Sequence, residues 1–222
     1  MTSTAIERLA QSRADAQLAR LADQGSARHP HLTALLAASG PHAARDLADS
    51  VHMLCSLYGR HPGLIDLALS ACPAGPARTW LLEASEQFER ERRYLVRLAS
   101  AVGPLPSTPG AAQTENALQA QRHAVETLAR SERYGCALGA ATGLVADWSA
   151  IRPLLDRAAA RAGLDTPLAS LPGETSIARV VTSAIDGVAA ERALFFGTEQ
   201  LLLQHRALFD LLEARASARR DC

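Results

Sequence analysis

Apolar residues recur at spacings of three and four along most of the chain, which is the period of an amphipathic α-helix. A clear stripe runs through Leu81, Phe88, Leu95 and Val102. We find no convincing period-two alternation of the kind that indicates a β-strand. Glycine and proline clusters divide the chain into helical segments. The predicted helices cover residues 3–22, 32–38, 42–58, 64–71, 78–102, 112–133, 135–163 and 174–216, with Gly187 and Gly197 as candidate breaks in the last one.

Long helices joined by short connections favour an antiparallel up-and-down helical bundle. The predicted fold class is therefore all-α, with ferritin-like and heme-oxygenase-like bundles as reference shapes. We expect one helical domain over residues 1–222, with short helices in 1–75 and a long-helix bundle core in 77–216. Pro153 lies inside the predicted helix 135–163, so it should kink that helix or begin a new first turn.

The charge composition excludes several kinds of chemistry. All 23 basic residues are arginine, and 23 acidic residues balance them to a net charge of zero. Without lysine the chain cannot form a Schiff base, a phosphate-binding P-loop or a protein-kinase site. Acidic residues are interspersed among the arginines, so no clustered basic face indicates a nucleic-acid partner.

The remaining composition points to a protein of the cytoplasm. The chain contains no apolar run of about 18 residues, so we expect no membrane partner. Residues 1–27 carry scattered charges, which does not resemble the apolar core of a signal peptide. The cysteines, Cys55, Cys72, Cys136 and Cys222, are far apart, which fits reduced thiols. Partners and cofactors stay unknown, and a homo-oligomer stays open.

Several polar residues fall where the helical pattern calls for apolar ones. Glu91, Glu191 and His205 interrupt the stripes of the helices 78–102 and 174–216. Because burying an unpaired carboxylate is costly, each needs a partner or water. His123 and Glu126 belong to a polar stripe on helix 112–133. One interpretation is a shared polar core of these five residues, and the other is a shifted helical phase, pairing with arginines, or a solvated face.

The sequence lacks the pattern of a di-iron bundle. Such bundles use Glu-x-x-His on two helices, because a spacing of three puts both ligands on one face. The closest approach is the reversed His123-x-x-Glu126, so we assign no metal site.

Gly135, Gly139 and Gly143 lie four residues apart on one helical face. Each glycine costs a helix about 1 kcal/mol relative to alanine, so a reason is expected. The two candidate reasons are close helix packing and a flat ligand on exposed backbone, as on the distal helix of heme oxygenases. Cys136, near a helix start, is the candidate reactive thiol, with an inert buried thiol as the alternative. Around Pro153, a clamp on the kink is expected from Asp147, Trp148, Arg152 and Asp156.

Three stretches together resemble an uncharacterised all-helical family of alphaproteobacteria, of the sphingomonad type. They are residues 88–110 (FERERRYLVRLASAVGPLPSTPG), 121–159 and 200–216 (QLLLQHRALFDLLEARA). This resemblance implies a bacterial protein and supplies no activity or catalytic residue. Two functional classes remain: a helical bundle with a binding or structural role, and a cofactor- or metal-using enzyme or carrier with a Glu/His-lined core.

Overall fold

The computed structural model describes residues 3–133 and 135–221, with side chains described from residue 12 onward. Within these residues the chain is all-α and contains no strand, which confirms the predicted fold class. The elements are α1 (Ser3–Gln24), the short 3-10 helix η1 (Ser26–Arg28), α2 (Pro30–Ala37), α3 (Pro41–Tyr58), α4 (Leu64–Ala71), α5 (Pro76–Ala101), α6 (Ala111–Ala129), α7 (Cys136–Ala162), α8 (Glu174–Ala184) and α9 (Val188–Arg220).

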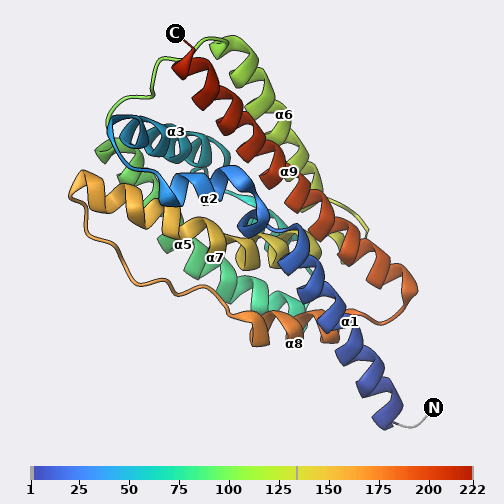
Figure 1. The fold of residues 1–222 in the computed structure, drawn as a ribbon. Coiled ribbons are helices and arrows are strands. Elements are labelled where there is room, and N and C mark those ends of the chain that lie inside the picture. Colours follow the sequence, from blue (N-terminus) through green and yellow to red (C-terminus); the bar gives the residue numbers. More distant parts are fainter. Residues whose placement is uncertain (1–2, 134, 222) are drawn as a thin grey trace.

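The order of contacts along neighbouring helices gives their relative directions. The ring of Tyr58 packs on Phe88, and His52 bonds to the carbonyl of Gly103, so α3 and α5 are antiparallel. A bond from Gln121 to the carbonyl of Gln204, together with one from Arg215 to Thr114, makes α6 antiparallel to α9. Figure 1 shows α6 and α9 side by side over most of their length.

Helix α7 runs in the same direction as α9. Gly139 meets Leu194, and further along both helices Asp147 meets His205. The alternation of an up-and-down bundle therefore stops at α7, because the connection 163–173 and α8 carry the chain back before α9 begins (Figure 1). This return leaves α7 between α9 on one side and α1 with α8 on the other.

The two helix breakers predicted in the last segment behave differently. The helix is interrupted at residues 185–187, just before α9 begins, so Gly187 lies at a break. Gly197 lies inside α9 and does not break it. This glycine lies at a close backbone contact with α7. Pro153 is likewise contained within one continuous helix, α7.

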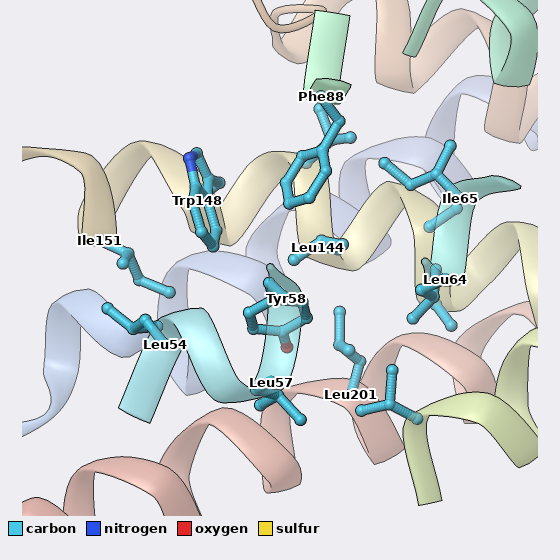
Figure 2. Packing of buried hydrophobic residues seen from close by; sticks show 14 of the residues in the cluster. Leu54, Leu57, Tyr58, Leu64, Ile65, Phe88, Leu144, Trp148, Ile151 and Leu201 are labelled. Atoms are coloured by element: carbon cyan, nitrogen blue, oxygen red, sulfur yellow. The ribbon is translucent and has the colours of Figure 1, made fainter. Parts of the chain in front are cut away.

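Aromatic rings hold the middle of the core together. Tyr58 contacts the rings of Trp148 and Phe88 edge-on, with centroids 5.6 and 6.4 Å apart. Figure 2 shows these rings with Leu54, Leu144 and Ile151 around them. The core thus joins α3, α5 and α7 at the level where the polar residues described below are buried.

A buried ion cluster attaches the end of α9 to α3. Asp49, whose side chain is fully buried, accepts three hydrogen bonds from Arg215 at 2.7, 2.9 and 3.2 Å and one from Arg219 at 2.5 Å. Arg219 also donates to Asp46 and Thr108. Each charge here has an opposite partner, which burial requires. In the described residues, no helix combines the length and apolar character needed to cross a membrane.

Candidate functional site

A cavity of about 430 Å³ lies along one side of α7. Its walls come from α1, α7, α8 and the connection 163–173, and they include Leu18, Leu21, Val145, Leu171 and Ile177. Pockets for small organic molecules have about 300–1,000 Å³ and are mostly apolar with a few placed polar groups. The cavity therefore has the size and wall chemistry of a ligand site.

Glu91 forms part of the cavity wall although only 2% of its surface is exposed. One carboxylate oxygen accepts a hydrogen bond from Arg152 at 2.5 Å, and the other accepts from the indole N–H of Trp148 at 3.0 Å. Because α5 supplies the carboxylate and α7 supplies both donors, this bonding fixes the register between the two helices. The ion pair also compensates the charge of the buried carboxylate.

Arg152 connects the cavity to the loop that covers it. Its Nε donates to Asp156 at 2.7 Å, and its Nη2 donates to the backbone carbonyl of Pro167. The guanidinium also lies over the ring of Tyr94, 4.6 Å from the centroid, which is a favourable cation–π distance. All three guanidinium nitrogens are thus occupied by protein acceptors, Glu91 being the third.

Asp147 adjoins Trp148 on α7 and also lines the cavity. Its carboxylate accepts from the backbone N–H of Ser26 at 2.6 Å, from the Ser26 hydroxyl at 2.5 Å, and from Nδ1 of His205 at 2.5 Å. Burial acts to raise the pKa of Asp147, but the hydrogen bonds from His205 and Ser26 outweigh it and hold that pKa below its ordinary value. Asp147 is therefore a buried carboxylate at neutral pH.

The bonding continues from His205 to Tyr58 on α3. The Tyr58 hydroxyl is bonded to Nε2 of His205. Burial, reinforced by the charge of Asp147, raises the pKa of Tyr58 well above its ordinary value, so this hydroxyl keeps its proton at neutral pH. Nδ1 of the ring faces the Asp147 carboxylate, which can only accept, so this nitrogen carries a proton and donates it. The network Ser26–Asp147–His205–Tyr58 joins η1, α7, α9 and α3.

This network positions helices and exposes no nucleophile. Tyr58 is 4% exposed, His205 is 1% exposed, and neither lines the cavity. What the cavity offers a bound molecule is apolar surface and carboxylate oxygens. Over the described part of the chain, no group of three or more His, Cys, Asp or Glu side chains could hold a metal ion.

The structure separates the five residues of the predicted polar core. Glu91 and His205 are buried in the two adjacent networks, which meet at Asp147 and Trp148. Glu191 lies at the start of α9 and pairs with Arg13 at 3.1 Å, partly exposed. The remaining two, His123 and Glu126, are exposed on α6.

The glycine residues of α7 lie against α9. A Cβ atom on Gly139 would stand 2.0 Å from the carbonyl oxygen of Leu194, and one on Gly197 would stand 2.0 Å from the carbonyl oxygen of Cys136. At Gly143 the two nearest neighbours are side-chain carbons, at 3.2 and 3.3 Å, and the backbone of Thr198 is at an ordinary contact distance of 3.5 Å. Gly135 has a φ of +94° at the start of α7. Cys136 is 1% exposed in this contact.

Sequence reasoning missed Ser26 and Tyr58, and it assigned Asp147 to a clamp around Pro153. Spacing carries a signal that could have placed Asp147. The stripe Gly135, Gly139, Gly143 continues after four more residues to Asp147, just as Gly197 on α9 continues by fours to His205. Because positions four apart share a helix face, the face of α7 that carries the glycines would also carry Asp147.

Fold and site define an all-α protein whose central helix is packed tightly on one side and borders a ligand-sized cavity on the other. The chain belongs to a family of unknown function, DUF6975, whose profile matches residues 21–220. No curated protein and no solved structure matches the chain significantly. The comparisons give no support to the alternative of a cofactor- or metal-using enzyme or carrier.

Proposed function

We propose that this protein binds a small organic molecule in the cavity between α1, α7, α8 and the connection 163–173. The observation that carries the proposal is the cavity of about 430 Å³ with apolar walls and buried Glu91 and Asp147 at its edge. A convergence of apolar surface and few polar groups is the usual form of a binding site. The polar side chains there are held by protein partners, which suits binding better than catalysis.

The wider setting is part of the same proposal. It includes a single helical domain, a bacterial origin, which the family resemblance implies, a cytoplasmic location, which the widely spaced cysteines favour, and no nucleic-acid partner, which the interspersed charges favour. Self-association of the chain stays open within it.

Trp148 provides a local reporter for binding, because it lines the cavity and the sequence has one other tryptophan, Trp80. The experiment titrates Trp80→Phe protein with N-phenylnaphthylamine, a neutral apolar probe that fluoresces in apolar surroundings. We expect saturable probe emission together with energy transfer from Trp148.

Two alanine replacements on α7 locate the bound probe. Ala146 lines the cavity, so Ala146→Phe should fill space there and abolish saturable binding. Ala160 is exposed on the same helix outside the cavity, so Ala160→Phe should leave binding unchanged. Saturable binding that survives Ala146→Phe, or no binding to the unmodified cavity, would overturn the proposed function.

A further inference from the structure

The charged groups around the cavity are unequal in sign. The described residues that line it include three carboxylates, Glu91, Asp147 and Glu174, and one basic side chain, Arg152. Acidic side chains therefore outnumber basic ones among the lining residues.

Protein acceptors hold the one basic side chain of this wall, and a carboxylate beside it keeps acceptor capacity. Arg152 donates to Asp156, Glu91 and Pro167, so each of its nitrogens has a protein partner. A carboxylate can accept about four hydrogen bonds. Glu91 accepts two, from Arg152 and Trp148, and thus keeps acceptor capacity.

Pro153 adds another acceptor to the same stretch of α7. Proline has no backbone N–H, so the carbonyl of Ser149, four residues earlier, lacks its ordinary helical donor. Ser149 and Ala150 both line the cavity. The interruption in the helix ladder thus falls on the turn that borders the cavity, where a ligand N–H or O–H can replace the missing donor.

From these observations we infer that the ligand is an organic cation with an apolar body, such as an amine attached to a hydrocarbon or aromatic group. Its cationic head lies at Glu91 and the Asp147 side of the wall, and its body lies against Leu18, Leu171 and Ile177. An anionic ligand of the same shape would meet like charges in a partly desolvated space, which is strongly unfavourable. This inference rests on the proposed binding function and adds the ligand class.

Three probes with one carbon skeleton test the charge preference at neutral pH: phenylpropylamine, phenylpropanol and phenylpropionate. Affinities come from Trp148 emission in Trp80→Phe protein and from displacement of N-phenylnaphthylamine. We expect the amine to bind best, the alcohol next and the carboxylate least, with about a tenfold gap between the two charged probes. A carboxylate that binds as well as the amine would overturn the inference.

Replacement of single carboxylates identifies the groups responsible. Glu91→Gln should reduce the preference for the amine most, and Glu174→Gln, at an exposed position, should reduce it less. Glu86→Gln is the matched control, since Glu86 is exposed on α5 and does not line the cavity. If Glu91→Gln does not fold, Glu174→Gln and the probe ranking on otherwise unmodified protein still decide the question.

The two proposals fail in different ways. Binding of the neutral probe with equal affinities for amine and carboxylate would remove the cation preference and leave the binding function standing. Loss of the amine preference in Glu86→Gln, with none in Glu91→Gln or Glu174→Gln, would also overturn the assignment. Absence of neutral-probe binding would contradict the binding function itself, and the inference with it.

Discussion

Two faces of α7 use small residues to opposite effect. Toward α9, Gly139 and Gly197 let two backbones approach so closely that an added Cβ would stand 2.0 Å from a carbonyl oxygen. Toward α1 and α8, Ala146 and Ala150 border about 430 Å³ of open space. The small side chains are similar, so the difference comes from the opposing element: a glycine-bearing helix on one side, and an irregular connection on the other.

Small residues on a helix therefore allow close packing but do not by themselves produce it. Helix α9 packs directly against the first face because its own glycine, Gly197, lies at the contact with α7. On the second face the connection 163–173 is held at Pro167 by Arg152, and it does not fill the volume beneath it. An alanine-rich helix can therefore carry a packed interface on one face and a cavity on another.

The largest effect is expected from Gly139→Ala. Its new Cβ would clash with the backbone of Leu194, and backbone cannot move aside without separating α7 from α9. We expect a loss of about 3 kcal/mol or more in the free energy of unfolding, measured by urea denaturation.

Gly143→Ala is the matched control for that substitution. The tight contacts of its Cβ would be with side-chain carbons of Leu201 and Thr198, at 3.2 and 3.3 Å, while the nearest backbone atom is at 3.5 Å. These side chains can shift slightly, and alanine favours the helix, so the net change should be within about 1 kcal/mol. Equal losses in the two variants would contradict the close-contact description of the α7–α9 face.

The next effect is expected at Asp147, on the border between the two faces. Asp147→Asn removes the charge that accepts bonds from Ser26 and His205. An amide cannot accept at both positions, so a buried donor is left poorly bonded, at a cost of about 2 kcal/mol. Thermal and urea unfolding at neutral pH measure this loss. Asp165→Asn, at an exposed position, should change stability by no more than about 0.5 kcal/mol.

At acid pH, the difference in unfolding free energy between unmodified protein and Asp147→Asn should become smaller. The folded pKa of Asp147 is lowered, and the unfolded value is about 3.9, so the unfolded chain takes up this proton at a higher pH. The contribution of Asp147 is therefore complete above that value and is lost as pH falls through the folded pKa. Urea midpoints at neutral pH and below about pH 4 should show unmodified protein converging on Asp147→Asn. A constant gap would mean that Asp147 does not titrate as described.

Much of the helical pattern could be predicted from the sequence, because it is local. Apolar spacing and breakers placed the helices, including the interruption near Gly187. They could not reveal that Gly197 continues a helix, since that depends on the backbone of Cys136 across the interface. The relative directions of the helices could not be predicted either. Helices α7 and α9 run parallel because the connection 163–173 and α8 return the chain between them.

The candidate site was only partly visible in the sequence. Glu91 and His205 stood out because they interrupt apolar stripes, and both are buried. Arg152, the partner of Glu91, was expected only in a clamp at Pro153. Tyr58, the partner of His205, carries no such signal, because a tyrosine on an amphipathic helix fits a surface equally well. His123 joined the predicted core by spacing alone, and the structure exposes it on α6.

A smaller effect is expected from Tyr58→Phe. The ring keeps its edge contacts with Trp148 and Phe88, and only the hydroxyl bond to Nε2 of His205 is lost. One such bond contributes about 1 kcal/mol to stability. Urea unfolding at neutral pH measures the loss in unfolding free energy. A loss well above that of Asp147→Asn would mean that Tyr58, and not the Asp147 carboxylate, contributes most of the stability of this network.

The smallest effect is expected on the open face, from Ala146→Leu. The added carbons enter the cavity and meet apolar walls, so the area they bury offsets the rotamer freedom they lose. We expect a change within about 0.5 kcal/mol in unfolding free energy, together with weaker binding of N-phenylnaphthylamine. Three added carbons on this face would then cost less than one added carbon at Gly139. A loss as large as that of Gly139→Ala would mean that both faces of α7 are closed, and the contrast between them would not hold.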